Sequence, residues 1–87
     1  MKRILITGAT SGIGRATALR LAAPDTEIII TGRRADRLEA LRLEVEAKGA
    51  QCVVLNFDVR SEKECQENLI PLGRVDNLIN NAGLAAG

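Results

Sequence analysis

The chain has 87 residues, of which 46% are hydrophobic and 26% are charged, and its formal net charge at pH 7 is +1. This composition fits one small globular domain and excludes a disordered or fibrous chain. The near balance of charge argues against a protein that binds nucleic acid or a membrane surface, because such proteins need a concentrated basic surface.

The first half of the chain predicts two strands, each followed by a helix. An apolar run at residues 4–6 predicts a strand, and residues 13–23, rich in Ala, Leu and Arg and closed by Pro24, predict a helix. Residues 28–30 predict the second strand. Residues 35–48 predict the second helix, because their apolar side chains share one stripe.

The second half continues the same alternation. Residues 53–55 predict a third strand and residues 78–79 a fourth. Between them, Ser61 is expected to cap a third helix with Glu64 as its capping-box partner, and Pro71 marks the helix end. Apolar runs without polar alternation are typical of buried parallel strands. The pattern predicts a doubly wound, Rossmann-like α/β fold with strand order 3-2-1-4, the first two helices on one face and the third on the other.

A glycine-rich turn, TGATSGIG, follows the first strand at residues 7–14. Gly8 is expected to let the chain leave the strand tightly, Gly12 to let a pyrophosphate approach the backbone, and Gly14 to let the helix pack closely. Free N–H groups at the helix start would face the anion. The glycine spacing disfavours a nucleoside-triphosphatase loop, and the alternative is that the glycines serve only the turn. The predicted phosphate-binding residues are Gly8, Thr10, Ser11, Gly12, Ile13 and Gly14.

The end of the second strand predicts which dinucleotide is bound. For NAD, a carboxylate is expected there, about 20 residues past the glycines, but here the chain reads Thr-Gly-Arg-Arg and the first carboxylate is Asp36. Guanidinium groups favour the extra 2′-phosphate of NADP. We therefore predict NADP, with Arg33 as first choice for the phosphate and Arg34 as second. Replacing Gly32 by Asp together with Arg33 by Ala is expected to reverse the preference. The alternative is that both arginines are ordinary solvated residues.

Three motifs together resemble a known family. The TGATSGIG turn matches the T-G-x-x-x-G-x-G fingerprint of the classical short-chain dehydrogenase/reductase family, and residues 80–83, Asn-Asn-Ala-Gly, match its N-N-A-G motif. The resemblance implies that Asp58, followed by Val59, contacts the adenine. It also implies that part of the second motif lies along the cofactor near its ribose, namely Asn81, Ala82 and Gly83. Asp58 could instead only turn the chain, and the asparagines could only join strand ends.

The resemblance implies hydride transfer between the nicotinamide and a small alcohol or carbonyl compound, with a similarity to the subgroup that oxidises 3-hydroxy acids. The family's catalytic Ser, Tyr and Lys follow the N-N-A-G segment, whereas this sequence has no Tyr and its last lysine is Lys63. No catalytic residue is predicted, and the chain is expected to be the N-terminal cofactor-binding part of a longer enzyme, inactive alone. The alternatives are a non-catalytic dinucleotide-binding sensor and, disfavoured by the glycine spacing, an extended-type epimerase.

The cysteines and the apolar runs predict no further site. Cys52 and Cys65 are expected to be small hydrophobic side chains, with neither a metal nor a disulfide. No apolar run is long enough to span a membrane, and the apolar start is too short for a signal peptide, so a cytoplasmic location is expected. The resemblance implies a homo-oligomer whose contacts involve helices outside these 87 residues.

Overall fold

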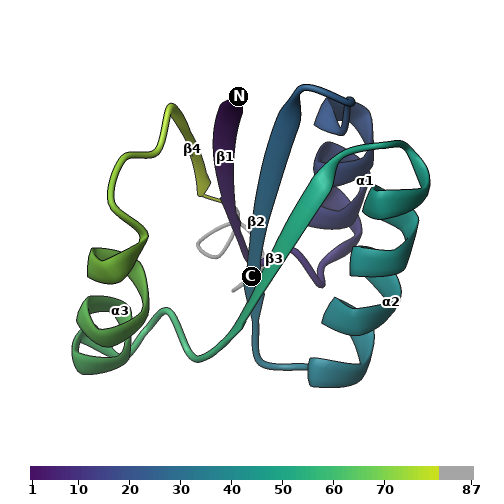
Figure 1. Ribbon diagram of the computed structural model, residues 1–87. Coiled ribbons are helices and arrows are strands. Elements are labelled where there is room, and N and C mark those ends of the chain that lie inside the picture. The colour runs from purple at the N-terminus through teal and green to yellow at the C-terminus, as the bar shows by residue number, and fades with distance from the viewer. Residues whose placement is uncertain (81–87) are drawn as a thin grey trace.

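The computed structural model describes residues 1–80 and confirms the predicted architecture. Four parallel strands form one sheet in the order β3-β2-β1-β4. The strands are β1 (Lys2–Thr7), β2 (Thr26–Gly32), β3 (Gln51–Asn56) and β4 (Asn77–Asn80). The helices are α1 (Gly12–Leu21), α2 (Ala35–Ala47) and α3 (Glu62–Leu69), and the short 3-10 helix η1 covers Ile70–Leu72. Figure 1 shows α1 and α2 on one side of the sheet and α3 on the other.

The main apolar core lies between the sheet and the pair α1 and α2. In the register of β1 and β2, Ile4 lies beside Ile28 and Ile6 beside Ile30, and all four side chains are buried. They face the predicted stripe of α2, whose buried residues are Leu38, Leu41 and Val45. Burying each such side chain contributes roughly 1.5–3 kcal/mol. This packing fixes the carboxyl ends of β1 and β2 relative to the start of α2.

The opposite face of the sheet is covered less completely within residues 1–80. Leu5 and Ile29 are buried there, whereas Leu78 of β4 is 61% exposed. Helix α3 has no buried residue among those described. None of the helices in the described part of the chain is long and apolar enough to cross a membrane.

The end of α1 differs from the sequence prediction, whereas the start of α3 agrees with it. Helix α1 ends at Leu21, and Ala22 is already extended, so the predicted end at residue 23 is wrong by two residues. Pro24 explains the difference, because it disfavours helical geometry in the residue before it. Ser61 caps α3 as predicted, its Oγ accepting from the Glu64 N–H at 3.3 Å. The Ser61 N–H donates to the Asp58 carbonyl oxygen at 2.9 Å, so the reciprocal half of the capping box is not needed.

Arg3 joins three segments at the amino-terminal edge of the sheet. Its Nε donates to Glu27 Oε1 at 2.6 Å, and its Nη1 donates to the carbonyl oxygens of Leu72 and Arg74, both at 2.6 Å. Its backbone N–H donates to Asp76 Oδ2 at 2.8 Å. The start of β1 therefore holds β2 and the turn before β4 in place.

Candidate cofactor-binding site

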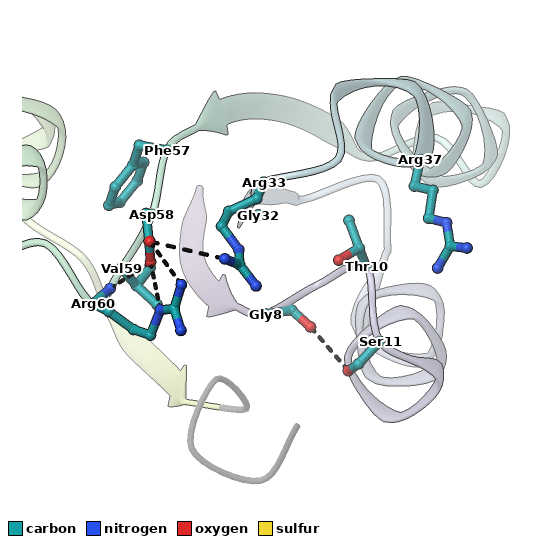
Figure 2. Close-up of a pocket in the computed structure, with 10 residues that line it drawn as sticks. All are labelled: Gly8, Thr10, Ser11, Gly32, Arg33, Arg37, Phe57, Asp58, Val59 and Arg60. Carbon is teal, nitrogen blue, oxygen red and sulfur yellow. Dashed lines mark hydrogen bonds and ion pairs between the residues drawn. The ribbon is translucent and has the colours of Figure 1, made fainter. Parts of the chain in front are cut away.

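The carboxyl ends of β1, β2 and β3 surround a cavity of about 250 Å³. In open parallel sheets this edge, beside the first strand-to-helix turn, is where ligands bind. Figure 2 shows the lining residues, which come from the three strand ends, from the turn after β1 and from the first turn of α2. The lining residues are Gly8, Thr10, Ser11, Gly32, Arg33, Arg37, Phe57, Asp58, Val59 and Arg60.

The turn between β1 and α1 is closed by its own hydrogen bonds. Gly8 has a φ of 64°, a left-handed conformation that suits glycine. Ser11 Oγ donates to the Gly8 carbonyl oxygen at 2.9 Å and accepts from the Gly14 N–H at 3.0 Å. The Ser11 hydroxyl hydrogen, expected as a donor to phosphate, is therefore engaged inside the turn. A Cβ on Gly14 would collide with the Gly8 carbonyl and lie 2.9 Å from Ala9 Cα, so α1 packs against the turn as closely as predicted.

The start of α1 is open where a phosphate is expected. A Cβ on Gly12 would meet no atom within 4 Å, and Ile13 is 60% exposed. The N–H groups of these first helical residues have no partner within the helix itself, and the helix dipole places partial positive charge there. This geometry fits an anion held by backbone N–H groups.

Three arginines follow β2, and only two of them line the cavity. Arg33 lines the cavity with a side chain 63% exposed, and its Nη1 lies 4.0 Å from Asp58 Oδ2. Arg34 does not line the cavity, and its Nε lies 3.8 Å from Asp36 Oδ1. Arg37, in the first turn of α2, does line it and makes no ion pair or side-chain hydrogen bond within residues 1–80. Of the two arginines that follow Arg33, the one that lines the cavity is thus Arg37 rather than Arg34.

Asp58 follows β3 and holds a tight turn. Its Oδ1 accepts from the Arg60 N–H at 2.9 Å and from Arg60 Nε at 3.2 Å, and its Oδ2 accepts from Arg60 Nη2 at 3.1 Å. Such a bond to the N–H two residues on is a common aspartate turn. The side-chain hydrogen bonds from Arg60 hold the pKa of Asp58 below its usual value, with smaller help from the Arg60 N–H and from Arg33. Asp58 is therefore an anion that is already neutralised locally.

Backbone hydrogen bonds join the strand ends that form the cavity. The Ala9 N–H donates to the Thr31 carbonyl oxygen, and the Phe57 N–H donates to the Gly32 carbonyl oxygen, both at 3.0 Å. A Cβ on Gly32 would lie 3.0 Å from Thr10 Cγ2. The predicted exchange of Gly32 for Asp therefore needs Thr10 to move, and a change at Arg33 alone is the cleaner test of specificity.

Some of the lining could not be predicted from the motifs. Gly32, Arg37, Phe57 and Arg60 were not predicted as site residues. The available signals were the spacing of Arg37, four residues after Arg33, and the aspartate turn that brings Arg60 back over Asp58. Both signals place a side chain in the cavity only if it points in one particular direction, which the sequence does not specify.

The predicted residues Asn81, Ala82 and Gly83 lie outside the described residues. Asn80, just before them, accepts a hydrogen bond at its Oδ1 from Thr7 Oγ1 at 2.9 Å, which joins the ends of β1 and β4. The structural role that was the alternative for the asparagines is therefore present at Asn80.

Neither cysteine lies in the cavity. Cys52 of β3 and Cys65 of α3 are both free thiols and half-buried. Burial raises the pKa of the Cys52 thiol to about 12. The lining thus offers three guanidinium groups and one carboxylate, and α1 begins directly after the lining residue Ser11. This set can bind an anionic nucleotide.

Curated proteins match almost the whole chain. A serine 3-dehydrogenase of Rhizobium radiobacter is 48% identical over 97% of this chain, and an NADP-dependent 3-hydroxy acid dehydrogenase of Salmonella typhi is 39% identical over 97%. The chain spans only 34% of the length of each of these relatives.

Solved structures agree with the sequence matches. NAD⁺-bound xylitol dehydrogenase superposes with a TM-score of 0.82 at 34% identity, covering 88% of this chain and 31% of that one. A short-chain dehydrogenase of Sphingobium yanoikuyae in complex with NADPH gives 0.78 at 29% identity, covering 90% and 32%. The family model described as short chain dehydrogenase matches residues 2–87. The chain therefore belongs to the short-chain dehydrogenase family.

Proposed function

We propose that this chain binds NADP and is the cofactor-binding part of an oxidoreductase that transfers hydride between the nicotinamide and a small alcohol or carbonyl compound. One observation carries the choice of cofactor: at the end of β2, where a carboxylate would serve the ribose of NAD, the cavity is lined by Arg33 and Arg37. A 2′-phosphate would meet two guanidinium groups there. Arg34, the second choice from the sequence, is the alternative partner for the phosphate.

We propose that the remaining predicted residues contact other parts of the same cofactor. The turn from Gly8 to Gly14 would hold the diphosphate at the start of α1, where Gly12 leaves space for it. Asp58 and Val59 would lie against the adenine. Asn81, Ala82 and Gly83 would follow the cofactor toward its second ribose. When bound, the nicotinamide gives or accepts the hydride, and the residues described here bind and orient the cofactor.

The matched proteins bear on both the cofactor and the substrate class of this proposal. One relative is named as NADP-dependent and one structure contains NADPH, whereas another structure contains NAD⁺. The family alone therefore leaves both cofactors open, and the arginines that line the cavity favour NADP. Two relatives are named for serine or for 3-hydroxy acids, so we propose a 3-hydroxy acid or its carbonyl counterpart as the substrate class. We further propose a cytoplasmic, homo-oligomeric enzyme.

The test is the exchange Arg33→Ala in the intact protein, with NADPH and NADH titrated by calorimetry. A charge-assisted hydrogen bond contributes roughly 1.5–3 kcal/mol, so NADPH affinity should fall about tenfold to a hundredfold while NADH affinity stays unchanged. Arg20→Ala, an exposed arginine in the last turn of α1, removes the same charge away from the cavity and should change neither. Equal loss for both cofactors would contradict the assignment. Turnover of NADPH with a carbonyl substrate distinguishes an enzyme from a non-catalytic sensor.

A further inference from the structure

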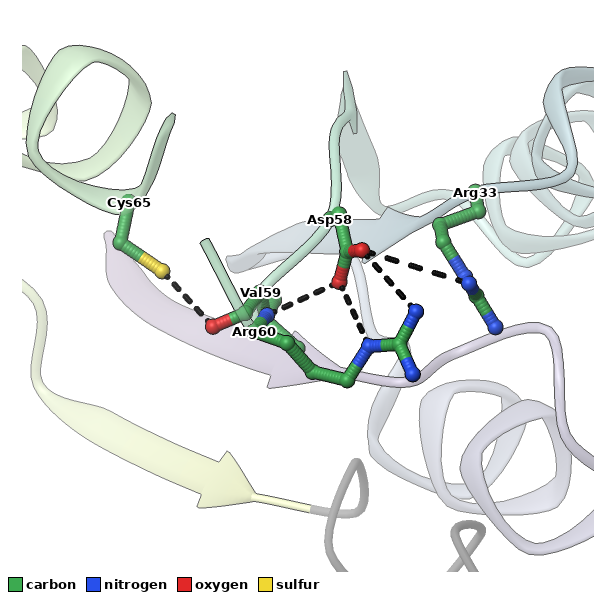
Figure 3. A network of polar contacts seen from close by, with 5 residues as sticks. All are labelled: Arg33, Asp58, Val59, Arg60 and Cys65. Atoms are coloured by element: carbon green, nitrogen blue, oxygen red, sulfur yellow. Dashed lines mark hydrogen bonds and ion pairs between the residues drawn. The ribbon is translucent and has the colours of Figure 1, made fainter. Parts of the chain in front are cut away.

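Arg60 lines the cavity, yet none of the predicted roles uses it. Figure 3 shows the guanidinium groups of Arg60 and Arg33 both facing the Asp58 carboxylate, each joined to it by dashed lines. Arg60 reaches it with side-chain hydrogen bonds of 3.2 and 3.1 Å, whereas Arg33 stays at 4.0 Å. The nearer arginine therefore takes most of the carboxylate's hydrogen-bonding capacity.

The loop that carries Arg60 is fixed on both sides. The Cys65 thiol donates to the Val59 carbonyl oxygen at 3.1 Å, and the Ser61 N–H donates to the Asp58 carbonyl oxygen at 2.9 Å. The Arg60 N–H is itself bonded to Asp58 Oδ1. These bonds place the Arg60 side chain against the carboxylate before any ligand arrives, as Figure 3 shows.

Asp58 is the only carboxylate that lines the cavity within residues 1–80. Left alone, it would oppose a 2′-phosphate in two ways. Its charge would repel the phosphate across a few ångströms, and its oxygens would attract Arg33, the cation proposed to bind that phosphate. Arg60 removes both effects, because a carboxylate that is already paired with one guanidinium competes weakly for another.

We infer that Arg60 is a positioning residue for cofactor choice: it occupies the Asp58 carboxylate and so leaves Arg33 free for the 2′-phosphate of NADP. This inference rests on the proposed binding of NADP by Arg33. It assigns specificity to a residue that does not touch the phosphate itself.

The measured quantity is the ratio of the NADH and NADPH dissociation constants of the intact protein. The adenine and diphosphate are common to both cofactors, so the ratio isolates the 2′-phosphate. Arg60→Ala should lower the ratio about two- to fivefold, the size expected when an exposed ion pair is redirected. Arg60→Lys keeps a cation beside Asp58 and should retain most of the ratio.

A matched control is Arg74→Ala. Arg74 pairs with Asp76 two residues on, at 3.0 Å, as Arg60 pairs with Asp58, but it lies at the opposite edge of the sheet. The exchange removes the same charge and should leave the ratio unchanged. A fall as large as that of Arg60→Ala would overturn the inference, because it would show an effect of net charge alone.

A double-mutant cycle separates an indirect role from direct contact with the phosphate. In the Asp58→Asn background, Arg60→Ala should no longer change the ratio, because no carboxylate is left for Arg60 to pair with. A further fall in that background would overturn the inference and place Arg60 on the phosphate. An unchanged ratio in Arg60→Ala alone would also overturn it. A wild-type protein without preference for NADPH would instead refute the proposed function.

Discussion

The two edges of the sheet use arginine in opposite ways. At the amino-terminal edge, the Arg3 side chain is 28% exposed and donates to Glu27 and to two carbonyl oxygens at 2.6 Å. At the carboxyl-terminal edge, Arg33 and Arg37 are exposed, and no side-chain hydrogen bond engages them within residues 1–80. A guanidinium group has five N–H donors. Arg3 uses its donors to hold the fold, whereas we propose that the other two donate to a ligand.

The glycine turn at the carboxyl-terminal edge offers the sharpest way to separate packing from binding. Gly14→Ala would drive a Cβ into the backbone of Gly8 and Ala9, which cannot rotate away, so the free energy of unfolding should fall by about 3 kcal/mol. Gly12→Ala meets open space and should leave stability unchanged while weakening binding of both cofactors, because its Cβ would occupy the diphosphate position. Chemical denaturation and calorimetry measure the two effects. Equal stability losses would refute the distinction.

The two kinds of arginine should respond to truncation in opposite ways. Arg3→Ala should lower the free energy of unfolding by about 1–2 kcal/mol, because it leaves carbonyl oxygens and Glu27 without their donor, and it should not change the NADH-to-NADPH ratio. Arg33→Ala should leave stability within about 0.5 kcal/mol and change only the ratio. Denaturant unfolding of both variants, followed by titration, completes the comparison. A large stability loss for Arg33→Ala would make that residue structural.

The smallest effect concerns acid stability at the amino-terminal edge. The Arg3 N–H, with smaller help from Arg74, holds the pKa of Asp76 below its usual value. A carboxyl with a lowered folded-state pKa contributes stability that is complete above its unfolded pKa, about 3.9, and is lost as pH falls through the folded-state pKa. Stability should therefore decline below about pH 4. Asp76→Asn keeps an acceptor for Arg3 and should flatten that decline, which denaturant unfolding at several pH values would measure.

Patterns that depend on backbone periodicity were predictable from the sequence. The apolar runs predicted all four strands, their connections predicted the order β3-β2-β1-β4, and the Ser61 cap was found where its spacing placed it. The end of α1 differs by two residues from the predicted one, because Pro24 disfavours helical geometry in the residue before it.

The cavity lining was harder to predict, because it depends on where long side chains turn. Arg34 and Arg37 both follow β2, and only the geometry of the first turn of α2 brings Arg37 to the cavity. Arg60 reaches Asp58 through a local turn that no motif includes. The sequence thus located the strand ends that form the site but not every side chain that faces it.

We propose that the exposed Arg33 and Arg37, which make no side-chain hydrogen bond within residues 1–80, bind the 2′-phosphate of NADP. Side-by-side calorimetric titration of the intact protein with NADPH and NADH tests it most directly. We expect NADPH to bind at least about tenfold more tightly than NADH, with the difference shrinking as salt screens the exposed arginines. Equal affinities, tighter binding of NADH, or no heat with either cofactor from a folded protein would contradict it.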